Sequence, residues 1–213
     1  MANTFAPKSQ EQEQRIESYY KFQSKIYDST RWTFLFGRKE IIHRIPLDTD
    51  QEFHLAEIGC GTGFNMEQVL KRFKNVTYTG IDVSPDMVAL ASAKGDRYLQ
   101  EVRILEEPYQ AGKQFFHTIP QVILFSYSLT MINPQWTELI DKAYEDLEKG
   151  GYIMVTDFHD SQFGGFKKHM QGHHVRMDGH LLPYLQEKFS TLFGEVKKAY
   201  GGVWEYVLFG GQK

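Results

Sequence analysis

The stretch Glu57-Ile-Gly-Cys-Gly-Thr-Gly-Phe64 decides the fold of this chain. A short apolar run from residue 53 to 58 leads into it, and apolar residues at helical spacing follow, so the three glycines lie in a strand-to-helix turn. Glycine there lets the backbone take positive φ and removes the Cβ that would keep a ligand away. Because the first N–H groups of the next helix point to the same spot, this turn is predicted to bind a ligand.

A second apolar strand, residues 76–81, ends at Asp82. A carboxylate at that strand end is placed to accept hydrogen bonds from both hydroxyls of a ribose. The dinucleotide fingerprint G-x-G-x-x-G has its third glycine one position later than this chain, which has Phe64 there. The alternative is a tight turn that binds no ligand. It would need one explanation for the three glycines and another for the aspartate at the strand end, so it is disfavoured.

An acidic residue two positions before G-x-G-x-G resembles motif I of the class I S-adenosylmethionine-dependent methyltransferases, and the resemblance covers about residues 53–210. It implies S-adenosylmethionine as the cofactor and Asp82 as the ribose-binding acid. Where that family usually shows a Gly-Asp-Ala loop, this chain has Leu105-Glu-Glu-Pro108, so Glu106 or Glu107 is expected to replace the aspartate. The predicted cofactor-binding residues are Tyr27, Glu57, Gly59, Cys60, Gly61, Gly63, Asp82, Val83, Met87, Glu106 and Ser126.

Length and composition agree with one compact domain of 213 residues. The net charge of −3 gives no global attraction to nucleic acid. The single cysteine, Cys60, excludes a disulfide framework and a Cys-based zinc site. The histidines between residues 159 and 180 match no compact metal motif, so no metal is expected. Without a signal-peptide core or an apolar run of roughly 18 residues, a cytoplasmic location is expected.

Alternating strand and helix patterns run from about residue 53 to the end of the chain. Strands are expected at 53–58, 76–81, 102–105, 122–125 and 152–156, followed by two strands, 196–200 and 203–209, joined by a two-residue turn. An open parallel sheet ending in a hairpin resembles the seven-stranded methyltransferase sheet. The predicted fold is therefore α/β and Rossmann-like, mostly parallel, with an antiparallel last strand. Residues 51–213 would form this core, and residues 1–50 a helical cap.

The segment 27–38 is dense in aromatic residues and has two interpretations. Its rings, including Trp32, either pack on the sheet, or the segment is a lid over the cofactor. In the lid, Tyr27 would lie near the methionine end of the cofactor, whose sulfonium and ammonium charges favour aromatic faces. The run Phe34–Phe36, beside Arg31, Arg38 and Lys39, is also the best candidate for peripheral contact with a membrane.

Three short segments resemble a narrower group, the bacterial betaine-lipid N-methyltransferases, which trimethylate the amino group of a diacylglyceryl-homoserine lipid. They are Ile26–Arg38, Phe125–Ile132 with the following Trp136, and Asp157–His159. The resemblance implies N-methylation of an amino-lipid headgroup or a small amine. O- or C-methylation of a small soluble metabolite, and a binding module without catalysis, remain as alternatives. The oligomeric state is left open.

The predicted catalytic residues are Tyr27 on the cap and three residues after neighbouring strands, Tyr127, Asp157 and His159. Methyl transfer is an in-line displacement, so the protein must hold the nucleophile close and aligned. A carboxylate or imidazole there can accept a proton from an amine or orient its N–H groups. The alternative for Asp157 is a hydrogen bond into its own loop, and for His159 an exposed loop position. His173, His174 and Arg176 would meet an anionic group of the acceptor.

Overall fold

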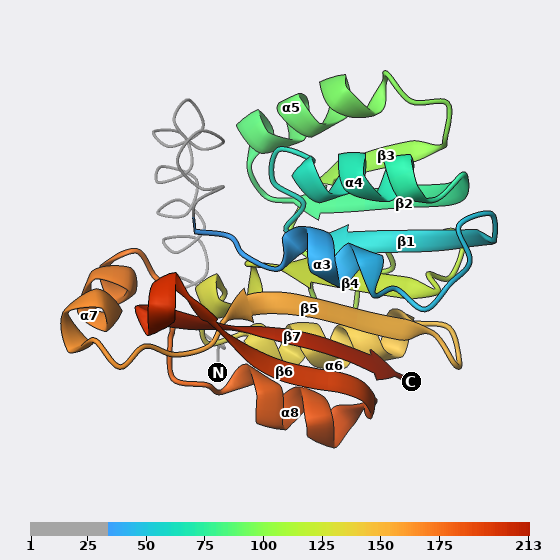
Figure 1. Cartoon of the computed structure of the whole chain (residues 1–213). Coiled ribbons are helices and arrows are strands. Elements are labelled where there is room, and N and C mark those ends of the chain that lie inside the picture. The colour runs from blue at the N-terminus through green and yellow to red at the C-terminus, as the bar shows by residue number, and fades with distance from the viewer. Residues whose placement is uncertain (1–33) are drawn as a thin grey trace, which may run out of the picture.

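The computed structural model describes residues 34–213, so Tyr27, Arg31 and Trp32 lie outside the described residues. One seven-stranded sheet has the order β3-β2-β1-β4-β5-β7-β6 (Figure 1). Only β7 runs against its neighbours, which confirms the predicted fold class and its antiparallel last strand. The strands are β1 Glu52–Ile58, β2 Asn75–Asp82, β3 Val102–Glu106, β4 Val122–Ser126, β5 Tyr152–Phe158, β6 Ser190–Ala199 and β7 Trp204–Gln212.

Helices cover both faces of the sheet. The described helices are α3 Arg38–His43, α4 Phe64–Arg72, α5 Pro85–Gly95, α6 Trp136–Asp146, α7 Gly164–Gly172 and α8 Leu181–Lys188, with short 3₁₀ turns η1 Leu129–Met131 and η2 Tyr200–Gly202. In Figure 1, α3, α4 and α5 lie on the near face, and α6 and α8 on the far face. The arrowheads of β1, β2 and β5 point left, so the carboxyl edge of the sheet faces α7.

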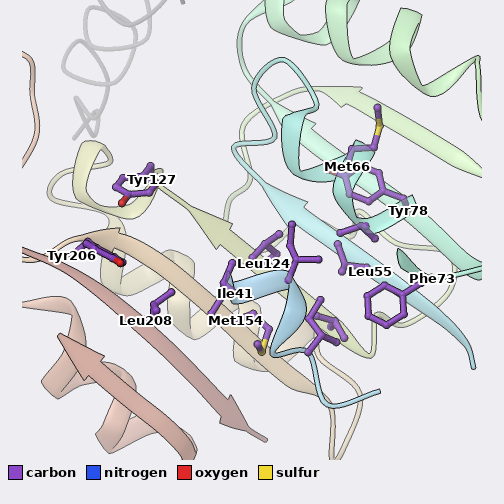
Figure 2. Close-up of a cluster of buried hydrophobic side chains, with 14 of the residues drawn as sticks. Ile41, Leu55, Met66, Phe73, Tyr78, Leu124, Tyr127, Met154, Tyr206 and Leu208 are labelled. Carbon is purple, nitrogen blue, oxygen red and sulfur yellow. The ribbon is translucent and has the colours of Figure 1, made fainter. Parts of the chain in front are cut away.

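Strand side chains alternate between two separate cores, as the period of two requires. Leu55, Leu124 and Met154 belong to the core under α3 and α4, which Figure 2 shows. Their neighbours Ala56, Ile123 and Ile153 belong to the other core, under α6 and α8. Because the central strands are buried on both faces, they read as continuous apolar runs rather than as alternating ones.

The end of the predicted cap packs on the sheet. Leu35 and Phe36 contact the core, whereas Phe34 stacks on Trp204 and stays 42% exposed. Gly37 has φ +80°, and a Cβ there would lie 2.9 Å from the side chains of Thr156 and Leu208. The interpretation in which these aromatics pack on the core is therefore confirmed for Phe36.

Two details of the C-terminal half differ from the sequence-based expectation. The β6 strand begins at Ser190 rather than at residue 196, because its side chains are mostly exposed and give no apolar signal. The connection between Ala199 and Trp204, which pair directly, has four residues instead of two. The helix α7 was not expected, and none of its residues is buried.

Candidate cofactor and acceptor site

The glycine turn has the backbone that the sequence predicted. Gly59, Gly61 and Gly63 have φ values of +77°, +54° and +77°, which L side chains rarely adopt. A Cβ on Gly59 would lie 2.7 Å from the Cβ of Ser128, and one on Gly63 would lie 3.0 Å from the Met66 methyl. Gly61 is different, because nothing lies within 4 Å of its Cβ position. The open side of the turn is therefore at Gly61.

Asp82 joins the end of β2 to this turn. Its Oδ2 accepts a hydrogen bond of 2.8 Å from the Gly61 N–H, and its Oδ1 accepts one of 3.0 Å from the Ser84 N–H. Burial raises the pKa of Asp82 despite these bonds. Each carboxylate oxygen keeps a further lone pair, so the side chain can still accept the hydroxyls of a ribose. Val83 follows at the same edge and is half-buried.

Glu57 is buried beside the turn and is held by side chains of neighbouring elements. Asn65 Nδ2 donates a 2.6 Å hydrogen bond to Oε1, and the Tyr78 hydroxyl donates to Oε2. Glu57 is 1% exposed, and burial raises its pKa to about 7. Met87 is fully buried and the Cys60 thiol is buried. Burial of these three side chains leaves only their backbone atoms open to a cofactor, so a role for these residues in cofactor binding stays a prediction.

The two glutamates after β3 lie in different surroundings. Glu106 pairs with Asp82 in the sheet register and is exposed at the strand end. Glu107 forms an ion pair with Lys113, and its N–H donates to the Asp82 carbonyl. Glu106 is therefore the better placed of the two to meet the base of a bound nucleoside.

Ser126 ends β4 and carries a buried hydroxyl with no hydrogen-bond partner among the described residues. Buried polar atoms in native proteins are nearly always paired, so an orphaned one points to a ligand. The free side of Gly61, the spare acceptors of Asp82 and the N-terminus of α4 lie at the same carboxyl edge. These residues fit the nucleoside part of S-adenosylmethionine.

Tyr127 anchors the N-terminal segment. Its hydroxyl donates a 2.8 Å hydrogen bond to the Phe36 carbonyl, and its ring packs edge-on against Phe158. Burial raises its pKa well above the ordinary value, so the phenol does not exchange a proton near neutral pH. The ring is buried and belongs to the core cluster, and Figure 2 shows it, like Tyr206, at the left end of that cluster. The catalytic assignment of Tyr127 is therefore replaced by a role in holding the segment at residue 36.

Asp157 is 0% exposed and bonds into its surroundings. Its Oδ1 accepts hydrogen bonds of 2.5 Å from the Thr130 hydroxyl and 2.8 Å from the Phe158 N–H, and Oδ2 accepts one of 3.2 Å from the Thr130 N–H. Burial raises its pKa to about 6. The structure is closer to the alternative, since the carboxylate holds a loop, the one after β4. Its prediction as a catalytic residue is corrected because the carboxylate is fully buried and is bonded to Thr130 in the loop after β4, rather than to its own loop or to an open crevice.

His159 is not the exposed loop histidine of the alternative. The residue is half-buried, its N–H donates to the Glu205 carbonyl, and its carbonyl accepts from the Gly179 N–H. Its ring atom Nδ1 is buried without a partner among the described residues, and burial lowers its pKa. A neutral imidazole with an unused nitrogen is thus present after β5.

The insertion between β5 and α8 was predicted to meet an anionic group of the acceptor, and its contacts do not support that role for Arg176. Arg176 Nε donates a 2.8 Å hydrogen bond to Asp178, which compensates the positive charge expected to meet an anionic acceptor. The rings of His169 and His173 pack on each other, with their centroids 4.7 Å apart.

Within residues 34–213, no group of three His, Cys, Asp or Glu side chains could hold a metal ion. The same residues contain no helix long and apolar enough to cross a membrane.

Sequence reasoning missed the pair Asp178 and His180 and the rings around Trp204. Asp178 accepts a hydrogen bond from His180 Nδ1. Trp204 stacks between Phe34 and Phe166, with both centroid distances at 5.3 Å. The rings around Trp204 come from segments far apart in the chain, so no local spacing indicated them. Asp178 and His180 are only two residues apart, but their spacing matches no motif that would have singled them out.

The strand order, the glycine turn and the strand-end aspartate are those of class I S-adenosylmethionine-dependent methyltransferases. A family model described as "Methyltransferase domain" matches residues 30–194, and the chain belongs to that family. S-adenosylmethionine is the cofactor of this fold and site.

Curated relatives of this chain are methyltransferases of different substrates. A malonyl-[acyl-carrier protein] O-methyltransferase of Ilyobacter polytropus is 26% identical over 149 residues, 68% of this chain and 52% of that protein. A trans-aconitate 2-methyltransferase of Delftia acidovorans is 30% identical over 117 residues, 54% of this chain and 41% of that protein. The chain thus spans about half the length of the curated relatives it matches.

Solved structures share the fold at low identity. The N-methyltransferase NodS from Bradyrhizobium japonicum, in complex with S-adenosylhomocysteine, has a TM-score of 0.73 at 16% identity and covers 92% of this chain and 97% of that one. The 1,6-didemethyltoxoflavin-N1-methyltransferase of Burkholderia thailandensis has a TM-score of 0.73 at 14% identity and covers 100% of this chain and 92% of that one. At these identities the likeness extends to the fold alone.

Proposed function

We propose that this protein transfers the methyl group of S-adenosylmethionine to the nitrogen of an amino-lipid headgroup or a small amine. The observation that favours nitrogen as the methyl acceptor is a cluster of aromatic rings around the buried Trp204 at the carboxyl edge of the sheet, in which Phe34 and Tyr200 are exposed. Phe34, Phe166 and Tyr200 contact its ring. Aromatic faces stabilise ammonium groups, and each methylation of an amine leaves a cationic or protonatable product.

The charges near this edge also favour an amine over a carboxylate. Lys167 forms an ion pair with Asp160 and Arg176 forms one with Asp178. These cations are therefore compensated and less suited to bind an anionic acceptor. The named relatives include an O-methyltransferase, so O- or C-methylation of a small soluble metabolite remains the second candidate.

An amino-lipid acceptor requires contact with a membrane surface, and the same edge offers candidates for it. Phe34, Phe163 and Tyr200 are 42%, 56% and 55% exposed. Exposed aromatic side chains can enter the interfacial layer without spanning it. Residues before Phe34 are proposed to complete the site as a lid, with Tyr27 near the methionine end of the cofactor.

The test is methyl transfer with a panel of acceptors. Purified protein and S-adenosylmethionine are incubated with diacylglyceryl-homoserine in phosphatidylcholine liposomes, free homoserine, trans-aconitate or malonyl-[acyl-carrier protein]. S-adenosylhomocysteine release and the gain of methyl groups by mass spectrometry are the measurements. Methylation of either amine supports the proposal. Methylation of only the carboxylates would establish the second candidate, and S-adenosylhomocysteine binding without any transfer would indicate a binding module.

A further inference from the structure

The segment that follows α7 crosses the carboxyl edge of the sheet. The Arg176 N–H donates to the Thr130 carbonyl after β4, and the Gly179 N–H donates to the His159 carbonyl after β5, both at 2.9 Å. Val175 and Met177, on either side of Arg176, are buried. The segment is therefore fixed over the ends of β4 and β5, where open α/β sheets bind their ligands.

His180 lies at the end of this segment, and one of its ring nitrogens is held by a carboxylate. Asp178 Oδ1 accepts the hydrogen bond from Nδ1, so the proton of the neutral ring is on Nδ1. Asp178 also accepts from Arg176, which fixes the carboxylate. The edge of Trp136 packs on the imidazole with ring centroids 4.6 Å apart. These contacts hold the ring in one orientation.

The other nitrogen of His180, Nε2, is buried and has no partner among the described residues. The side chain is only 8% exposed, and burial lowers its pKa, so the ring is neutral at pH 7. The unprotonated Nε2 can only accept a hydrogen bond. His159 lies next to the same segment, because a Cβ on Gly179 would be 3.1 Å from its ring, and its Nδ1 is also buried without a partner.

We propose that His180 is the general base of the methyl transfer, with Asp178 as its positioning residue. The acceptor nitrogen forms a bond to the methyl carbon, the bond from that carbon to sulfur breaks, and S-adenosylhomocysteine leaves with the electron pair. A primary or secondary acceptor nitrogen then loses a proton, which goes to Nε2 of His180. The proposal rests on the proposed function, because a carboxylate acceptor has no proton to give.

The first experiment compares His180→Gln with His117→Gln, an exposed histidine on the connection before β4. The probe is diacylglyceryl-homoserine in phosphatidylcholine liposomes. Loss of a general base is expected to lower kcat about 10²- to 10⁴-fold in His180→Gln, with unchanged S-adenosylhomocysteine affinity. The His117 variant should match the wild type. An unchanged kcat in His180→Gln would overturn the proposal.

The second experiment addresses Asp178 and does not depend on folding of the His180 variant. The charged or titratable groups that face His180 are Asp178, Arg176 and His159. Asp178→Asn removes a carboxylate that raises the pKa of His180, so the rising limb of kcat/KM against pH should move to lower pH. A merely structural role for Asp178 would lower activity without moving that limb, and would overturn its part of the proposal.

A third measurement separates failure of this proposal from failure of the proposed function. Nitrogen NMR of the imidazoles in the S-adenosylhomocysteine complex at pH 7 should show His180 protonated on Nδ1 alone, with Nε2 shifting when homoserine is added. If the wild type methylates no amine, the proposed function fails. If His180 carries its proton on Nε2, or does not respond to homoserine, the base assignment fails whatever the acceptor.

Discussion

Replacing Gly61 by alanine tests the assignment of the open side of the turn. The φ of +54° costs a non-glycine residue about 1–2 kcal/mol, and nothing within 4 Å of the new Cβ adds a clash. The free energy of unfolding should therefore fall by only about 1–2 kcal/mol. The cofactor must pass where the methyl now stands, so the affinity for S-adenosylhomocysteine should fall at least about tenfold, which corresponds to about 1.4 kcal/mol.

Isothermal calorimetry measures the affinity and urea denaturation the stability. Gly201→Ala is the matched control, because Gly201 has φ +68° and also no atom within 4 Å of its Cβ position, but lies between β6 and β7. It should lose the same stability and none of the affinity. Gly59→Ala should lose more stability, since its Cβ would be 2.7 Å from Ser128. Equal S-adenosylhomocysteine affinities of the Gly61 and Gly201 variants would refute the reasoning.

Three further changes test the surroundings of the turn. Asp82→Ala should weaken S-adenosylhomocysteine binding by about 1.5–3 kcal/mol for each ribose hydrogen bond lost; unchanged calorimetric affinity would contradict the assignment. Burial raises the pKa of Glu57 from 4.5 to about 7, so the folded protein favours the protonated carboxyl. The corresponding contribution to the free energy of unfolding, about 3 kcal/mol, is complete below pH 4.5 and is lost as the pH rises to about 7. In urea denaturation, Glu57→Gln should make the free energy of unfolding depend less on pH between 4.5 and 7. The same pH dependence as in the wild type would contradict a raised pKa of Glu57. Tyr127→Phe removes the hydrogen bond to the Phe36 carbonyl, so the free energy of unfolding should fall by about 0.5–1.5 kcal/mol while kcat stays unchanged. A large fall in kcat would show that Tyr127 is catalytic.

The cofactor half of the site was predictable because its signals are local. Three glycines at alternate positions, an apolar run on each side and Asp82 at the next strand end specify the turn and its partner strand. The seven-stranded sheet follows from the continuous apolar runs, which central strands buried on both faces require. The first half of β6, with its mostly exposed side chains, gave no such signal, and only residues 196–200 were predicted as a strand.

The acceptor half was not predictable in the same way, because position at a strand end does not fix where a side chain points. Asp157 could face the crevice or a loop, and the Thr130 hydroxyl and N–H hold it against the loop after β4. Glu57 lies beside the glycines in sequence, yet Asn65 and Tyr78 hold its carboxylate in the protein interior. These partners come from other elements, so the sequence pattern alone left both orientations open.

The two halves are built from different kinds of atoms, and this explains why the cofactor can be assigned more readily than the acceptor. The cofactor side uses backbone N–H groups and glycines without side chains, a construction that many acceptor chemistries can share. The acceptor side, as proposed, uses side chains from segments far apart in the chain, among them Phe34 before α3, His180 before α8 and Trp204 at the start of β7. Substitutions there can change the acceptor without disturbing the turn. Relatives that share the family therefore carry little information about the acceptor of this protein, and variants of these side chains carry the most.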